Sequence, residues 1–160
     1  MDRRNTPCSS IRPWILDVLL AVNDDFGPCG LRYAVKHHDN ETVKALLEGG
    51  AQVNVLHCRD RRTPLHYAAE YKNSKALEML IGQPEVCINQ KDVNKDTPLH
   101  VAVRSGCLEI VKMLLEARAE FEVKNLDGVE PVQIARDANM AEVLALLEDK
   151  YGELGREPPT

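Results

Sequence analysis

The 160-residue sequence has few aromatic residues, since Phe, Trp and Tyr together make up only 4% of it. Apolar residues nevertheless make up 44%, close to the average of globular chains, so wholesale disorder is not expected. The core must therefore be built from Leu, Val, Ile and Ala. A chain of 160 residues suits one domain with a substantial core.

The sequence also lacks an excess of positive charge. It has 20 basic and 25 acidic residues, which give a net charge of −5. Proteins that bind nucleic acid need clustered positive charge on one face. The only dense basic group comprises Arg59, Arg61 and Arg62, and Asp60 interrupts it. We therefore do not expect a nucleic-acid partner.

Motifs for metal, cofactor or catalytic chemistry are missing as well. The five cysteines are scattered without CxxC spacing, which indicates free thiols in a reducing compartment. His37 and His38 are adjacent, as are His57 and Cys58, and neither pair fits the ligand spacing of a zinc site. There is no glycine-rich phosphate loop and no nucleophile with its base. We expect no cofactor, no metal and no enzymatic activity.

Long hydrophobic runs are absent too. The apolar stretch Trp14–Val22 contains Asp17 and is far shorter than the ~20 residues that span a membrane. Residues 11–27 instead predict an N-terminal helix, either a cap on the first repeat or a docking element for a partner. Residues 1–10 and 151–160 are predicted to be disordered tails. We expect the cytoplasm, and also the nucleus, as the location.

What the sequence does contain is an internal repeat. Thr63–Ala68 (TPLHYA) returns as Thr97–Ala102 (TPLHVA), an offset of 97 − 63 = 34 residues. A weaker copy, Glu130–Ala135, follows at an offset of 130 − 97 = 33, and Leu31–Ala34 precedes the first copy by 34. Apolar residues of a second segment, such as Leu46, Leu80 and Leu114, recur at the same spacing.

Each unit predicts two short helices and a turn. Thr63 and Thr97 are good N-cap residues, and the prolines after them suit the first helical position. A polar break and a second apolar-periodic helix follow. An extended piece and a turn such as Asn125–Gly128 then lead to the next cap.

This pattern resembles the ankyrin repeat over residues 30–149, and the two TPLH phrases are specific to that family. The resemblance implies an all-α solenoid of about four helix-turn-helix units with short hairpin loops. His66 and His100 would then be structural. Arg118 departs from the family pattern, because it stands where a glycine usually ends the second helix. The units are expected at residues 28–58, 59–92, 93–125 and 126–150.

By the same resemblance, a partner protein would bind the concave face and the loop tips. Tyr and Arg are enriched in binding hot spots, so the second repeat is the best candidate anchor. The expected partner-binding residues are Tyr33, Lys36, His37, Arg59, Arg61, Arg62, Tyr67, Glu70, Tyr71, Asn94, Lys95, Val101 and Arg104.

The leading hypothesis is a non-enzymatic protein–protein interaction module, a scaffold, adaptor or inhibitor that is monomeric when free. The alternative is a regulatory or targeting subunit of an enzyme complex, such as a ubiquitin ligase, that docks through the N-terminal helix. Asn54 resembles the ankyrin asparagine that 2-oxoglutarate-dependent oxygenases hydroxylate, so its modification is a further expectation. The sequence does not identify the partner.

Overall fold

The computed structural model describes residues 27–159. The tail expected over residues 1–10 and the helix expected over residues 11–27 lie outside this range, except for Gly27. Within the described residues, eight helices form four consecutive pairs. The pairs are α2 (Gly27–Lys36) with α3 (Asn40–Glu48), α4 (Pro64–Glu70) with α5 (Ser74–Ile81), α6 (Pro98–Ser105) with α7 (Leu108–Glu116), and α8 (Pro131–Asp137) with α9 (Ala141–Glu153).

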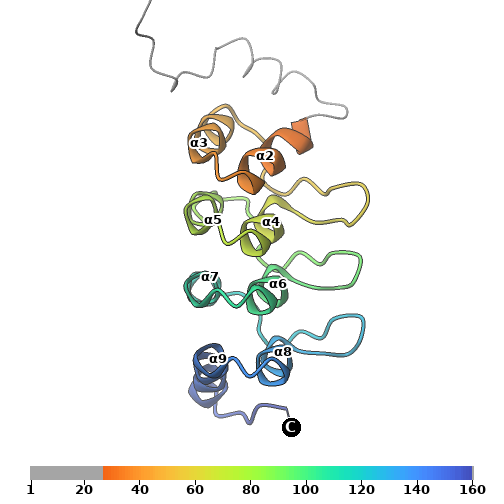
Figure 1. The fold of residues 1–160 in the computed structure, drawn as a ribbon, viewed down its shortest axis with the longest axis vertical. Coiled ribbons are helices and arrows are strands. Elements are labelled where there is room, and N and C mark those ends of the chain that lie inside the picture. The colour runs from red at the N-terminus through yellow and green to blue at the C-terminus, as the bar shows by residue number, and fades with distance from the viewer. Residues whose placement is uncertain (1–26, 160) are drawn as a thin grey trace, which may run out of the picture.

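The four pairs stack in a single column, as Figure 1 shows. The first helices of the pairs lie above one another in one layer and the second helices in another, and consecutive pairs contact each other within both layers. Hairpin loops project sideways from the first-helix layer. This arrangement confirms the predicted all-α solenoid with its short hairpin loops. Among the described residues, no helix combines the length and the apolar character that a membrane span requires.

The TPLH phrases form the predicted helix starts. Thr63 has extended backbone angles (φ −86°, ψ 165°) and caps α4, and Pro64 occupies the first helical turn. A capping box closes the cap, because the Nδ1 atom of His66 accepts a hydrogen bond from the backbone N–H of Thr63 at 3.1 Å. Thr97 and His100 repeat the motif at the start of α6, at 3.2 Å.

Both capping histidines also reach into the next repeat. The Nε2 atom of His66 donates to the carbonyl oxygen of Asp96 at 3.1 Å, and that of His100 donates to the carbonyl of Val129 at 3.2 Å. Both side chains are fully buried. Each histidine therefore caps its own helix and fastens it to the following loop, which gives His66 and His100 the structural role that the resemblance implied.

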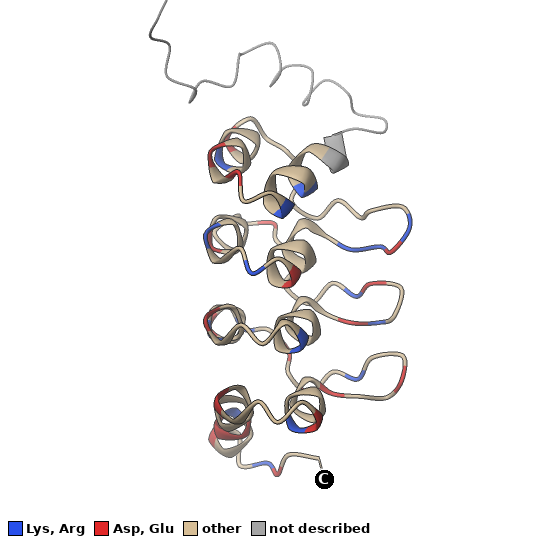
Figure 2. Cartoon of the chain, viewed as in Figure 1, with Lys and Arg blue, Asp and Glu red and all other residues tan. Residues whose placement is uncertain are grey.

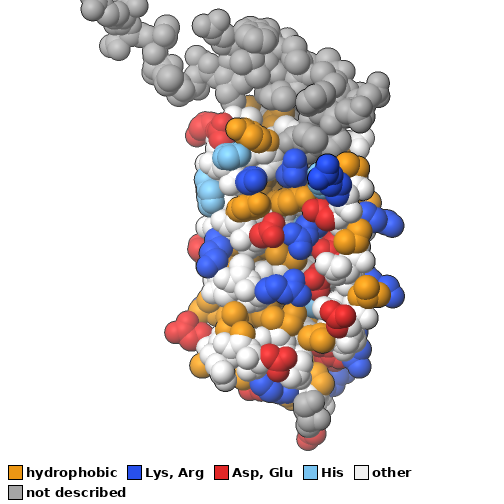
Figure 3. Space-filling model, turned by 45° about the vertical axis from the view of Figure 1, so that its right-hand side comes forward, with side chains coloured by type: hydrophobic (Ala, Val, Ile, Leu, Met, Phe, Trp, Pro, Cys, Tyr) orange, Lys and Arg blue, Asp and Glu red, His pale blue; other side chains and the backbone are white. Residues whose placement is uncertain are grey.

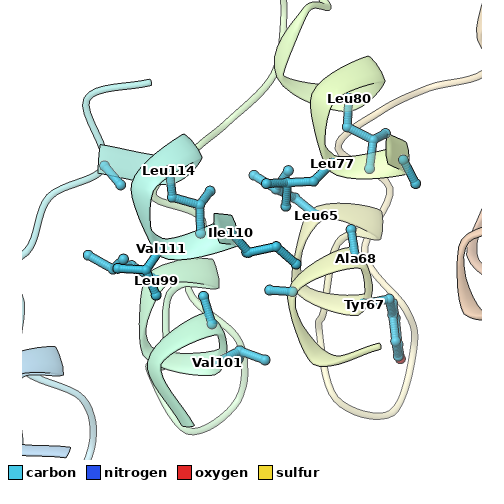
Figure 4. Close-up of a cluster of buried hydrophobic side chains, with 14 of the residues drawn as sticks. Leu65, Tyr67, Ala68, Leu77, Leu80, Leu99, Val101, Ile110, Val111 and Leu114 are labelled. Atoms are coloured by element: carbon cyan, nitrogen blue, oxygen red, sulfur yellow. The ribbon is translucent and has the colours of Figure 1, made fainter. Parts of the chain in front are cut away.

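The core lies between consecutive pairs and consists mainly of Leu, Val, Ile and Ala, as predicted. Figure 4 shows Leu77 and Leu80 of α5 in one layer with Leu114 of α7, and Ile110 pointing from α7 toward α4 and α5. These four side chains are fully buried. Burial of such side chains contributes about 1.5–3 kcal/mol each, which stabilises the stack.

The prediction that order ends at residue 150 is wrong. Helix α9 continues to Glu153, and Tyr151 is only 2% exposed. The Tyr151 ring packs edge-on against Phe121, with the centroids 4.9 Å apart, and its hydroxyl donates to Glu130 at 2.6 Å. These contacts join the end of α9 to the segment that connects the third and fourth repeats.

Arg118 adopts the left-handed backbone conformation, with φ at 63°, that the glycine usually found at this position would adopt. Its N–H donates to the carbonyl of Leu115 at 3.1 Å, and the N–H of Ala119 donates to that of Leu114 at 2.9 Å. Gly50 makes the matching bond at the end of α3 with φ at 85°. Arg118 therefore closes its helix as a glycine would, in a conformation that costs a non-glycine residue energy.

Candidate partner-binding surface

Within residues 27–159, three similar hairpin loops follow one another, which we call finger 1 (residues 57–62), finger 2 (residues 91–96) and finger 3 (residues 124–129). One backbone hydrogen bond closes each finger at 2.9–3.0 Å: His57 N–H to Arg62, Asp92 N–H to Asp96, and Asn125 N–H to Val129. Each finger also has one residue with positive φ, namely Arg61, Lys95 and Gly128. The three fingers therefore present equivalent positions in the same orientation.

Neighbouring fingers are joined through their backbones. The N–H of Val93 in finger 2 donates to the carbonyl of Asp60 in finger 1 at 3.0 Å. The N–H of Leu126 in finger 3 donates to the carbonyl of Asn94 in finger 2 at 2.8 Å. These bonds hold the row of tips together, so a partner meets one continuous surface.

Ion pairs connect the fingers to the first helices. Arg62 contacts Glu70 of α4 at 2.9 Å through Nη1 and the fully buried carboxylate of Asp92 at 3.1 Å through Nε. Arg104 of α6 contacts Asp96 at 2.9 Å. A partly buried arginine between two carboxylates fixes the angle between helix and finger.

Asp60 organises the interior of finger 1. Its carboxylate accepts hydrogen bonds from the Tyr67 hydroxyl at 2.7 Å and from the Arg62 N–H at 3.1 Å, and it contacts His57 Nδ1 at 2.9 Å. Burial alone would raise the pKa of Asp60, but these three partners outweigh burial and lower it. The Asp60 carboxylate is therefore engaged by groups of finger 1 and α4. Burial and the Asp60 hydrogen bond together raise the pKa of Tyr67 to about 12.

Aromatic rings lie along the exposed side of α2 and α4 in the first-helix layer. We call this side the concave side. Tyr33 stacks at a tilt on His37, with centroids 4.2 Å apart, and is 64% exposed. The ammonium of Lys36 lies 5.6 Å from the centre of the Tyr71 ring. In Figure 3, hydrophobic, basic and acidic side chains are interspersed down this side of the molecule. The first two repeats thus offer exposed apolar area next to positive charge.

The structure places most of the predicted binding residues at the surface. Arg62 and Tyr71 are half-buried. Tyr67 and Val101 are buried, at 5% and 4% exposure, so the prediction that their side chains face a partner is wrong. Tyr67 is covered because its hydroxyl turns toward Asp60 and the Arg32 guanidinium lies 5.4 Å from its ring centre. The exposed members of the predicted set are Tyr33, Lys36, His37, Arg59, Arg61, Glu70, Asn94, Lys95 and Arg104.

Two further residues on this side were missed by sequence reasoning. Arg32 lies against Tyr67, one residue before Tyr33 on α2. Leu126 is 60% exposed at the tip of finger 3. The repeat offset itself could have identified Leu126, because 126 − 33 = 93 aligns it with Val93, which is 46% exposed on finger 2.

Asn54 lies apart from the concave side, at the junction between the first two repeats. Its side-chain oxygen accepts a hydrogen bond from the N–H of Cys87 at 2.8 Å, and its amide donates to the carbonyl of Glu85. The Asn89 oxygen accepts similarly from the N–H of Glu120 at 2.9 Å. The Asn54 side chain thus joins neighbouring repeats, and hydroxylation there stays a prediction.

Charge is unevenly distributed along the column. Finger 1 carries Arg59, Arg61 and Arg62 against the single acid Asp60, whereas the tip of finger 3 carries Asp127. Figure 2 shows blue over most of finger 1 and red at the tip of finger 3. Among the described residues, no group of three or more His, Cys, Asp or Glu side chains is placed to hold a metal ion.

Stacked helix pairs with a row of fingers define a repeat solenoid whose exposed side binds other molecules. A family model described as ankyrin repeats (3 copies) matches residues 12–92, 31–125 and 87–154. The chain belongs to the ankyrin-repeat family, which confirms the resemblance read from the TPLH phrases. Ankyrin repeats are protein–protein interaction modules.

Curated relatives share this region. NF-kappa-B inhibitor zeta of Homo sapiens is 30% identical over 125 residues, covering 74% of this chain and 17% of that protein. B-cell lymphoma 3 protein of Homo sapiens is 33% identical over 135 residues, covering 84% and 29%. Tyrosine-protein kinase Shark of Drosophila melanogaster is 33% identical over 126 residues, covering 77% and 13%. The chain therefore spans less than a third of the length of each of these relatives.

Proposed function

We propose that the chain is a non-catalytic binding module that holds one partner protein across the fingers and the concave side of its first three repeats. The observation that carries this proposal is the row of fingers joined by the Val93–Asp60 and Leu126–Asn94 backbone bonds. Preorganised surfaces lose little conformational entropy on binding. The exposed Tyr33 and Arg61 supply the side-chain types that dominate interface hot spots.

The relatives suggest which partner to test first. One relative is named as an inhibitor of NF-kappa-B, so an NF-kappa-B subunit is the first candidate, with inhibition or adaptation as the role. This assignment would place the chain in the cytoplasm and the nucleus. Because a tyrosine-protein kinase is also similar, the alternative role as a regulatory part of an enzyme complex is tested alongside.

The experiment is quantitative capture from native lysate, with mass spectrometry, followed by direct binding to a purified NF-kappa-B subunit. Wild type is compared with a Tyr33→Ala, Lys36→Glu, Arg61→Glu variant, in which all three substituted residues are exposed. The matched control is Lys44→Glu, Lys112→Glu, which reverses two charges on the second-helix layer. Thermal unfolding first establishes that all three proteins fold.

The proposal expects a partner that wild type and the control capture and that the concave variant loses. Equal capture by all three proteins would refute the concave assignment. In that case, deletion of residues 1–26 tests the alternative, in which the N-terminal segment docks. Loss of the partner with folded repeats retained would assign docking to that segment.

A further inference from the structure

The three finger tips present different side chains at one equivalent position. Arg59, Val93 and Leu126 each lie two residues before the positive-φ residue of their finger. All three are exposed, Val93 at 46% and Leu126 at 60%. At this position, finger 1 therefore carries a cationic side chain, and fingers 2 and 3 each carry an apolar side chain. Exposed apolar side chains at two successive equivalent positions are unusual for tips that merely solubilise a loop.

Within residues 27–159, no carboxylate pairs with the two exposed arginines at the positive end of this row. Three carboxylates at finger 1 are engaged by other groups: Asp60 by Tyr67, and Glu70 and Asp92 by Arg62. Within residues 27–159, by contrast, neither Arg59 nor Arg61 makes an ion pair. A partner with an acidic side chain at this end would therefore meet two available guanidinium groups.

The spacing of the tips selects the shape of the ligand. Neighbouring packed helices lie about 8–10 Å apart, and we take the fingers, which follow the same stacking, to repeat at this interval. A polyproline II segment rises ~3.1 Å per residue with three residues per turn, or about 9 Å per turn. Its residues at every third position share one face. In a β-strand the side chains alternate with a period of two, so every third residue would change face.

We propose that the finger row binds an extended polyproline II segment of a partner protein, with an acidic residue opposite Arg59 and Arg61 and apolar residues three and six positions further along, opposite Val93 and Leu126. This inference rests on the proposed function and names the chemistry of its partner. Either chain direction gives the same spacing of three. The apolar tips and Asp127 on finger 3 disfavour a nucleic-acid strand, whose phosphates would require cations along the whole row.

The test is selection of a phage-displayed random peptide library, with a length of about 12 residues to span the three fingers, on the full chain. The expected result is enrichment of peptides with an acidic residue followed, in one direction, by apolar residues at the third and sixth positions. A synthetic enriched peptide is then titrated by fluorescence anisotropy. A peptide of the same composition with a shuffled order is its control.

Two pairs of variants locate the site. Arg59→Glu, Arg61→Glu should weaken binding at least about tenfold, whereas Lys44→Glu, Lys112→Glu should leave it unchanged. Val93→Asp, Leu126→Asp should weaken binding by a similar factor of about ten, whereas Leu154→Asp, a substitution of an equally exposed leucine, should not. Circular dichroism melts establish that every variant is folded.

Other outcomes overturn the inference. No enrichment, enrichment without an acidic residue, or a period of two would each refute the polyproline II assignment. Binding of a fluorescein-labelled single-stranded DNA that the arginine reversals abolish would assign the row to nucleic acid instead. If lysate capture depends on Tyr33 and Lys36 but not on Arg59, Val93 and Leu126, this inference fails while the proposed function stands.

Discussion

The Nε2 atom of His66 lies 3.1 Å from the carbonyl oxygen of Asp96 and donates a hydrogen bond to it. Because its Nδ1 atom accepts from the N–H of Thr63, the proton must be on Nε2 and the imidazole must be neutral. A second proton on Nδ1 would face the Thr63 N–H and break the cap. Burial lowers the pKa of His66, and burial likewise lowers the pKa of His100.

Because of these two histidines, we predict that the stability of the fold decreases at mildly acidic pH. Because the pKa of each is lower in the folded state than its ordinary ~6.5, the unfolded chain binds more protons once the pH falls below about 6.5. Their contribution to stability is complete above that value and is lost as the pH falls through the folded-state pKa. The midpoint of thermal unfolding should therefore be level from about pH 8 to 7 and fall between about pH 6.5 and 5.

The control is a His66→Gln, His100→Gln variant, because Gln does not titrate. Its unfolding midpoint should be lower at neutral pH and should fall less between about pH 6.5 and 5 than that of wild type. The carboxylates act in a different window. The pKa values of Asp60 and Asp96 are lowered in the folded state, so their contribution is lost only below about pH 4. A wild-type midpoint that is constant down to about pH 5 would contradict the assignment.

Leu114 tests the core between the second and third repeats, where it lies in one layer with Leu77 and Leu80. Its side chain is fully buried, so Leu114→Ala should lower the free energy of unfolding by about 2–5 kcal/mol. Leu126→Ala removes the same atoms from a residue that is 60% exposed and should change stability by no more than about 0.5 kcal/mol. Urea unfolding followed by circular dichroism measures both. Equal losses for the two variants would contradict the placement of Leu126 at an exposed tip.

Arg118 and Gly50 form a pair for testing backbone strain, since they occupy equivalent positions after α7 and α3. Both have positive φ, 63° and 85°. Arg118→Gly should stabilise the fold by about 0.5–1 kcal/mol. Glycine removes most of the energetic cost of the left-handed conformation, and the larger conformational entropy of the unfolded chain offsets only part of this gain. Gly50→Ala should destabilise it by about 1 kcal/mol, although no atom lies within 4 Å of the added methyl group. The same sign for both changes would refute the strain argument.

The sequence predicted the repeats well because period, caps and core all depend on local patterns. It could not distinguish Tyr33 from Tyr67, which occupy the same position in consecutive units, 67 − 33 = 34. Tyr33 is 64% exposed and Tyr67 only 5%. The difference comes from finger 1, whose Asp60 draws the Tyr67 hydroxyl inward, and no described finger precedes Tyr33. A repeat pattern assigns equal roles to equal positions, but the neighbours that decide burial differ between repeats.

Tyr151 escaped prediction for a related reason. Its partners, Glu130 and Phe121, lie 21 and 30 residues earlier, and the contact has no counterpart in the preceding units. A search for periodicity finds only what recurs. The Tyr151 contacts belong to the fourth repeat alone, so the pattern shared by the units does not indicate them.

This terminal contact yields the last prediction. Tyr151→Ala should lower the free energy of unfolding by about 3–5 kcal/mol, the range for a buried aromatic side chain. Tyr151→Phe keeps the ring against Phe121 but loses the bond to the Glu130 carboxylate, and should cost about 1.5–3 kcal/mol. Urea unfolding measures both, with Leu154→Ala as the exposed control on the same segment.

A chain truncated after residue 150 should resemble Tyr151→Ala, because both remove the contacts of Tyr151 with Phe121 and Glu130. Hydrogen exchange should locate the loss, with faster exchange in α8 and α9 than in α4 and α5, since each repeat contacts only its neighbours. If the truncated chain kept wild-type stability and exchange, residues 151–159 would be a dispensable tail and the stabilising role of Tyr151 would be refuted.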